Sequence, residues 1–112
     1  MKARNALLAA LPYEVESSLI ALGSHLKLAR LRRNLSTAEV AEKIGVSRFV
    51  VADAEKGKPT TGIAIYAALL WAYDLIDQLK ELADPTRDEE GAALALGRER
   101  LNAGRSRVDN DF

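Results

Sequence analysis

Residues 35–57 constrain the fold of this chain more than any other segment. Their sequence, LSTAEVAEKIGVSRFVVADAEKG, contains two short helical patterns on either side of a glycine. Ser36 and Glu39 have the spacing of a capping box, in which each side chain accepts a hydrogen bond from the backbone N–H of the other residue. The apolar residues that follow recur at helical spacing, so the first pattern predicts a helix over about residues 37–44.

A tight turn and a second helix follow directly. Gly45 tolerates the positive φ that a helix C-terminus often requires, and Ser47 is a second N-cap residue. The second helix is expected over about residues 48–56, because Gly57 ends it and Pro59 prevents its continuation. Two capped helices around a glycine corner have the spacing that presents the second helix to the major groove of DNA.

The rest of the chain is also predicted to be helical, which gives an all-α fold. Ala, Leu, Glu, Lys and Arg dominate the sequence, and no segment shows sustained alternation of apolar and polar residues. The additional helices are expected over about residues 2–10, 12–33, 63–72, 75–83 and 88–101. The last segment, residues 102–112, is polar and rich in Gly, Arg and Asp, so we expect it to be disordered when alone.

Two of these helices carry the candidate core. The long helix over residues 12–33 has an apolar stripe with the three- and four-residue spacing of one helix face, formed by Val15, Leu19, Leu22, Leu26 and Ala29. In the helix over residues 63–72, the residues expected to point inward are Ile65, Ala68, Leu69 and Ala72. Tyr66 and Trp71 are also expected in the core, with a dimer interface as the alternative role.

Charge is distributed unevenly along the chain, although the net charge is zero. Residues 24–58 hold eight Lys or Arg against four Asp or Glu, a balance of +4. Residues 74–99 hold three Lys or Arg against eight Asp or Glu, a balance of −5. The basic region coincides with the two-helix motif, so we expect it to face phosphate, with an ordinary solvated helix surface as the alternative.

Several classes of function have no support in the sequence. The chain has no cysteine and a single histidine, His25, so we expect neither a metal site nor a cofactor. Paired carboxylates occur without a nearby nucleophile or a glycine-rich loop, and we therefore expect no enzymatic activity. The apolar run at residues 6–11 is too short for a secretion signal, and no stretch is long enough to span a bilayer, so we expect a cytoplasmic protein.

The second helix of the motif carries the candidate base-reading residues. Val51 and Ala54 are expected to pack inward, which leaves the start of the helix exposed. There, an arginine can pair with guanine, apolar side chains can contact thymine methyl groups, and a carboxylate can accept from the cytosine amino group. The residues predicted for these roles are Arg48, Phe49, Val50 and Asp53. The predicted phosphate contacts are Ser36, Thr37, Ser47, Lys56 and Lys58.

These residues lie within a recognisable pattern. From about residue 22 to 75, the elements LxxARLRRNLSTAEVAEKIGVS, VVADAEKGK and IAIYAALLWAYDL resemble the XRE family of helix-turn-helix proteins, which includes lambda repressor and Cro. The resemblance implies a five-helix lambda-repressor-like domain that binds double-stranded operator DNA as a homodimer. It places the DNA contacts on the residues named above and implies an internal ion pair between Arg30 and Glu55.

The recognition helix departs from the family pattern. The family usually has Gln, Ser, Thr, Asn or Arg at these positions, whereas this chain offers apolar residues, one arginine and one aspartate. Asp53 either reads cytosine or neutralises Arg48 or Lys56 on its own helix. An alternative hypothesis is therefore an interaction module that keeps the fold and binds little DNA.

The C-terminal part resembles a narrower group. The pattern Asp84-Pro85-x-Arg87-Asp88-x-x-Gly91 is similar to HipB-like antitoxins, which pair with a HipA-type serine/threonine kinase toxin. This resemblance implies an autorepressing antitoxin, with a stand-alone phage-type regulator as the alternative. The predicted organisation is an N-terminal extension (1–14), the helix-turn-helix domain (15–83), an acidic helical segment (84–101) and a disordered tail (102–112).

Overall fold

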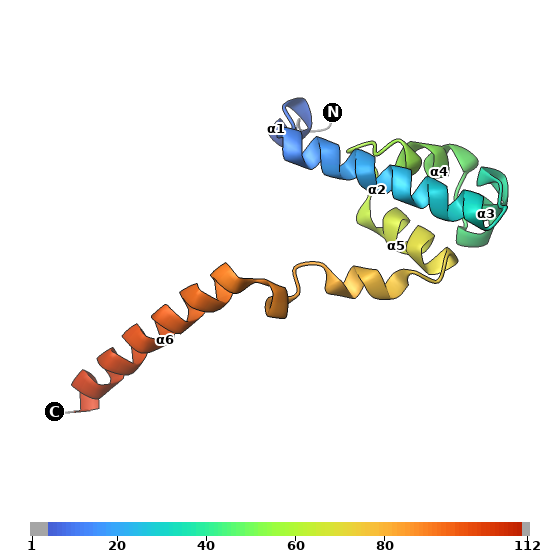
Figure 1. The fold of residues 1–112 in the computed structure, drawn as a ribbon. Coiled ribbons are helices and arrows are strands. Elements are labelled where there is room, and N and C mark those ends of the chain that lie inside the picture. Colours follow the sequence, from blue (N-terminus) through green and yellow to red (C-terminus); the bar gives the residue numbers. More distant parts are fainter. Residues whose placement is uncertain (1–4, 111–112) are drawn as a thin grey trace. The chain divides into compact units, whose positions relative to one another are not determined.

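The computed structural model describes residues 5–110, with side chains described for residues 5–105, and every regular element in that range is a helix (Figure 1). The elements are α1 (Ala6–Ala9), α2 (Tyr13–Arg32), α3 (Thr37–Ile44), α4 (Arg48–Glu55), α5 (Ile63–Ala72), the 3-10 helices η1 (Ile76–Glu81) and η2 (Pro85–Arg87), and α6 (Glu89–Asn110). The predicted all-α fold is confirmed. The chain divides into two compact units, residues 1–79 and 80–112.

Local capping defines α3 and α4 as the sequence predicts. The Ser36 hydroxyl accepts from the Glu39 N–H at 3.0 Å, and the Ser36 N–H donates to Glu39 Oε1 at 3.0 Å. Gly45 has φ +79° and ends α3, and the Ser47 hydroxyl accepts from the Val50 N–H at 3.4 Å. These bonds satisfy N–H groups that a helix leaves unpaired at its first turn, so both helix starts are fixed by nearby sequence.

The core of the first unit lies among α2, α3, α4 and α5. Val51, Ala54 and Leu69 are completely buried, and Val40 is 1% exposed. Leu22, Ile44, Val46 and Leu75 pack around this cluster and are partly buried. The inward positions expected for the motif helices and for Leu69 are therefore correct. Because α4 buries only one face, the opposite face stays open.

Two glycines allow α2 and α4 to approach each other closely. A Cβ added at Gly23 would lie 2.6 Å from the Ala54 carbonyl oxygen. Gly57 has φ +73°, and a Cβ there would lie 2.5 Å from the Leu19 carbonyl oxygen. Neither position has space for a side chain, so glycine is required by packing at residue 23 and by both packing and conformation at residue 57.

The apolar stripe of α2 is buried only in its C-terminal half. Leu26 and Ala29 belong to the core, whereas Val15 is 38% exposed. Leu19 lies against Gly57, where α4 has ended, so Val15, one turn earlier in α2, extends past the helix that covers the stripe. The expectation of one continuous core stripe is therefore wrong for its first turn.

The expected core position of Trp71 is also wrong. Trp71 is 54% exposed, whereas Tyr66 is 4% exposed as expected and Tyr73 is completely buried. The α5 sequence IAIYAALLWA is apolar on every side, so its periodicity does not identify the inward face. The Lys43 ammonium group lies 5.5 Å from the centre of the exposed Trp71 ring.

Three helix boundaries differ from the predictions. The segment expected as a helix over residues 75–83 is the 3-10 helix η1, and it lies between two residues with positive φ, Asp74 (59°) and Ala83 (55°). The helix α6 continues to Asn110, beyond the predicted end at residue 101, because no proline interrupts it. The first helix covers Ala6–Ala9. Residues 2–4 of the expected helix lie outside the described residues, and so do residues 111–112 of the expected disordered tail.

Replacing Gly23 with alanine should lower the free energy of unfolding by about 3 kcal/mol, at the upper end of the usual cost of overpacking. The cost is high because the new methyl group meets backbone atoms of α4, which cannot rotate away. Gly62→Ala is the matched control, since a Cβ there meets nothing within 4 Å and its φ of −72° suits alanine. Urea unfolding followed by tryptophan fluorescence measures both variants, and equal stability would contradict the close approach.

Candidate nucleic-acid interface

The exposed face of α4 brings the four predicted base-reading residues together. Phe49 is 67% exposed and Arg48 is also exposed, whereas Val50 and Asp53 are partly buried. Val51 and Ala54 on the same helix are completely buried. One short helix therefore has a face anchored in the core and a face with an arginine, an aromatic ring and a carboxylate, which are groups able to contact base edges.

Two side-chain contacts organise this open face. The Arg48 guanidinium lies 5.2 Å from the centre of the Phe49 ring, within the range of a cation–π interaction. Asp53 Oδ1 lies 3.3 Å from the Lys58 ammonium nitrogen, and both side chains are about half exposed. The sequence offered Arg48 or Lys56 as partners for Asp53, and the structure instead places Lys58 there. An exposed pair of this kind contributes little to stability.

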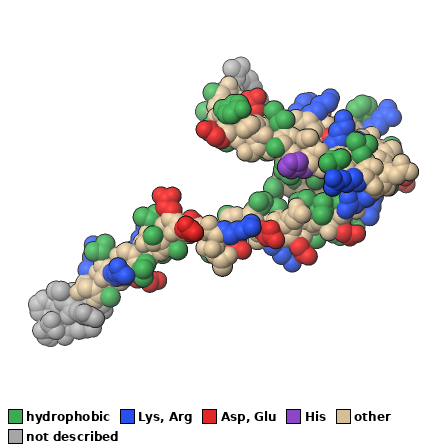
Figure 2. Space-filling view, viewed as in Figure 1, with side chains coloured by type: hydrophobic (Ala, Val, Ile, Leu, Met, Phe, Trp, Pro, Cys, Tyr) green, Lys and Arg blue, Asp and Glu red, His purple; other side chains and the backbone are tan. Residues whose placement is uncertain are grey.

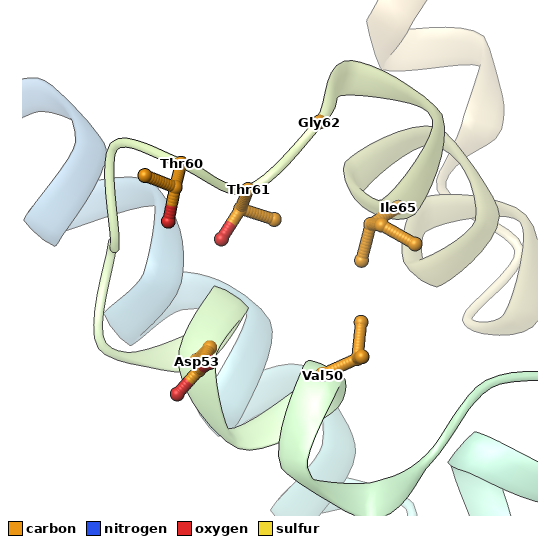
Figure 3. A pocket seen from close by; sticks show the side chains of 6 residues that line it. All are labelled: Val50, Asp53, Thr60, Thr61, Gly62 and Ile65. Carbon is orange, nitrogen blue, oxygen red and sulfur yellow. The ribbon is translucent and has the colours of Figure 1, made fainter. Parts of the chain in front are cut away.

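A shallow pocket of about 260 Å³ adjoins the open face of α4 (Figure 3). Val50 and Asp53 line it from α4, and Thr60, Thr61 and Ile65 line it from the following loop and α5. The sequence analysis missed the two threonines. Their position directly before Gly62, the N-cap of α5, could have indicated them as site residues, because the first backbone N–H groups of a helix have no partner within it.

The predicted phosphate contacts lie at helix ends. Ser36 and Thr37 are at the start of α3 and Ser47 is at the start of α4, where the helix dipole favours an anion. Hydrogen bonds from Ser36 hold the pKa of Glu39 below its usual value, so the α3 terminus also carries a local negative charge. Lys56 and Lys58 are exposed beyond the end of α4.

The helix-turn-helix part of the chain has an excess of basic side chains. The +4 balance of residues 24–58 lies in α2, α3, α4 and their connections. Figure 2 shows Lys and Arg side chains gathered around the part of the domain where the C-terminal half of α2 meets α3. Such a distribution attracts phosphate even though the whole chain has no net charge.

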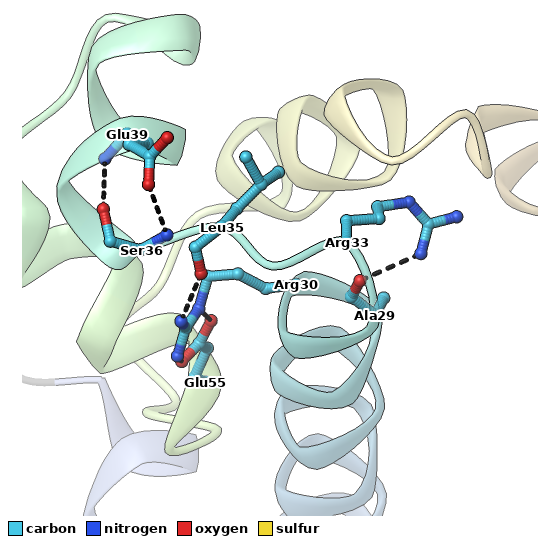
Figure 4. A network of polar contacts seen from close by, with 7 residues as sticks. All are labelled: Ala29, Arg30, Arg33, Leu35, Ser36, Glu39 and Glu55. Atoms are coloured by element: carbon cyan, nitrogen blue, oxygen red, sulfur yellow. Dashed lines mark hydrogen bonds and ion pairs between the residues drawn. The ribbon is translucent and has the colours of Figure 1, made fainter.

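A buried ion pair holds the end of α4 in place (Figure 4). Arg30 Nε donates to Glu55 Oε2 at 2.7 Å, and Arg30 Nη2 donates to Glu55 Oε1 at 3.0 Å. The two side chains are 10% and 6% exposed. Arg30 Nη1 also donates to the Leu35 carbonyl oxygen at 2.8 Å. This fork, implied by the family resemblance, joins α2 to the end of α4 and to the residue before the α3 cap, and hydrogen bonding to Glu55 raises the pKa of Arg30.

A second arginine joins α2 to the end of α5. Arg33 donates to the Ala29 and Tyr73 carbonyl oxygens, both at 2.9 Å, and its guanidinium lies 5.6 Å from the centre of the Tyr73 ring. Burial raises the pKa of Tyr73 to about 12, so its hydroxyl is neutral at physiological pH. Arginine contacts thus join the C-terminal end of α2 to the C-terminal ends of α4 and α5.

Comparison with protein families identifies the class of domain that α3 and α4 belong to. The helix-turn-helix domain family matches residues 21–83, and the chain belongs to this family. Domains of this family bind DNA and are typically not enzymes, so the chain has the fold of a DNA-binding regulator. No curated protein matches the chain. Within the described residues, no helix combines the length and the apolar character that crossing a membrane requires.

Replacing Arg30 with methionine should lower the free energy of unfolding by about 3 kcal/mol, because Glu55 is left buried without its partner. Arg32→Met is the matched control on the same helix, where the exposed side chain should cost less than about 0.5 kcal/mol. The double variant Arg30→Met, Glu55→Met should recover part of the loss, since no unpaired charge remains. Urea unfolding measures all three, and similar losses for Arg30→Met and Arg32→Met would contradict the buried pair.

Proposed function

We propose that this protein is a sequence-specific transcription regulator that binds double-stranded operator DNA as a homodimer. The observation that carries the proposal is the open face of α4, which presents Arg48 and Phe49 from a helix whose other face is locked into the core. In the proposed complex, α4 lies in the major groove with its first turn against base edges. The helix ends of α3 and α4, together with Lys56 and Lys58, contact the phosphates.

Dimerisation follows from the small size of the reading helix. The helix α4 has eight residues, so one copy reads too few base pairs to select an operator. Two copies would contact half-sites about 34 Å apart, one turn of DNA. The first candidate interface is the N-terminal part, where Leu7, Tyr13 and Ile20 are 49%, 78% and 50% exposed. The second is the α5–η1 region, which carries the exposed Trp71.

The resemblance to HipB-like antitoxins adds a partner to the proposal. We expect the chain to repress its own operon in the cytoplasm and to bind a HipA-type serine/threonine kinase toxin. The exposed leucines of α6, Leu94, Leu96 and Leu101, are available for such a partner. The aspartates of the shared pattern have local roles, because Asp84 caps η2 and Asp88 Oδ1 accepts from the Gly91 N–H at 2.9 Å. The pattern therefore defines helix starts, and toxin binding requires its own test.

A second candidate function is an interaction module with little affinity for DNA. The observation that favours it is the composition of the open face, where Phe49 is exposed and Asp53 adds a negative charge. An exposed aromatic ring beside a carboxylate is also able to contact a protein surface. If the protein binds DNA, the alternative to an antitoxin is a stand-alone regulator that has no toxin partner.

A gel-shift titration against the upstream region of the gene tests the proposed DNA binding. The wild type should bind, and Arg48→Ala should lose about 1–3 kcal/mol of discrimination between operator and random DNA. Lys58→Ala should instead weaken binding to all sequences and reduce the salt slope of log K by about 0.9, the loss of one phosphate contact. Failure to bind any duplex at low salt would favour the interaction module.

Co-expression with the product of the adjacent reading frame tests the antitoxin proposal. A kinase-type neighbour should co-purify with the wild type and with Arg48→Ala, since base reading and toxin binding use different surfaces. Truncation after residue 88 should remove the partner and leave operator binding intact, because residues 80–112 form a separate unit. If Arg48→Ala lost the partner and kept operator binding, Arg48 would belong to the partner-binding surface and not to the base-reading one.

A further inference from the structure

Arg48 and Phe49 form a cation–π pair on the first turn of α4, called the stacked group below. The guanidinium carbon lies 5.2 Å from the ring centre, and both side chains are exposed. Ser47 caps this turn through the Val50 N–H, so the backbone beneath the two side chains is fixed. A guanidinium plane supported by an aromatic face loses less freedom when it forms hydrogen bonds than a free side chain does.

The separation of the two groups limits which bases they can read together. Successive base pairs are about 3.4 Å apart, so two steps span about 6.8 Å. The 5.2 Å between the guanidinium and the ring centre is less than two steps, so the two groups are spaced for contacts with neighbouring base pairs.

Chemistry then excludes the same base pair. An arginine in the major groove pairs best with guanine O6 and N7, and a phenylalanine contacts the thymine methyl group. A G·C pair presents no methyl group in the major groove. If Arg48 reads guanine, the methyl group that Phe49 contacts must therefore belong to a neighbouring T·A pair.

Building on the proposed function, we infer that Arg48 and Phe49 read a G·C pair and an adjacent T·A pair as a single coupled unit. The aromatic ring has two roles, because it contacts the thymine methyl group and supports the guanidinium that pairs with guanine. Recognition of the guanine therefore depends on residue 49 as well as on Arg48. Without coupling, each side chain would instead read its base independently of the other.

The experiment begins with selection of the full-length protein on a randomised duplex library. The bound sequences should be enriched in G·C next to T·A. The best duplex is then synthesised in two altered forms, with uracil in place of the adjacent thymine and with 7-deazaguanine in place of guanine. The first change removes only the methyl group, and the second removes only the N7 acceptor.

Two variants of Phe49 separate its roles. Uracil should weaken the wild type and Phe49→Leu about fourfold, the effect of one methyl group, and should leave Phe49→Ala unchanged. The penalty for 7-deazaguanine should fall by about two- to fivefold in both variants, because neither supports the guanidinium as an aromatic face does. Leu28→Ala, an exposed apolar substitution on α2, is the matched control and should leave both penalties at their wild-type values.

The outcomes separate this inference from the proposed function. Three results would overturn the coupled unit alone. The selected sites could separate guanine from thymine, uracil could have no effect on the wild type, or the 7-deazaguanine penalty could be the same in the wild type and Phe49→Leu. Binding to no duplex at low salt would overturn DNA recognition itself, and the inference with it. Enrichment of the adjacent pairs together with the predicted penalties supports both.

Discussion

The bidentate contact between Arg30 and Glu55 is the interaction on which the position of α4 depends. It joins the last turn of α2 to the last residue of α4, and the same arginine donates to the Leu35 carbonyl oxygen just before the α3 cap. Both charges are buried, so neither can be removed without stranding the other. Because the fork has fixed geometry, it orients the helices as well as attracting them.

Close packing of α2 against α4 also determines the position of α4. Gly23 and Gly57 let the backbones of α2 and α4 approach closely, and Val51 and Ala54 then fill the space beside α3. The exposed residues of α4 follow from this arrangement, because a helix of eight residues with one anchored face has its remaining side chains pointing outward. The open face of α4 is therefore a consequence of how the core is packed.

The sequence predicted those features whose causes are local. Both caps of the motif, the glycine corner and the open face of α4 depend on residues a few positions apart, and they agree with the structure. The expected core position of Trp71 was wrong because α5 is apolar on every side, so only tertiary packing determines which side is buried. The Asp53–Lys58 pair and the threonines of the adjoining pocket depend on how the chain turns after Gly57, which spacing alone does not give.

The composition of the recognition helix has a consequence for specificity. Asp53 repels phosphate and holds Lys58 at 3.3 Å, so in the proposed complex a DNA phosphate competes with a carboxylate for the same ammonium group. This competition weakens binding to every sequence, whereas a cytosine amino group offers the carboxylate a compensating partner. The selectivity of a DNA-binding regulator is the ratio of its specific to its non-specific affinity. A residue that lowers the non-specific affinity can therefore raise selectivity without adding a contact. An apolar, partly acidic reading face is consistent with selective DNA binding on these terms.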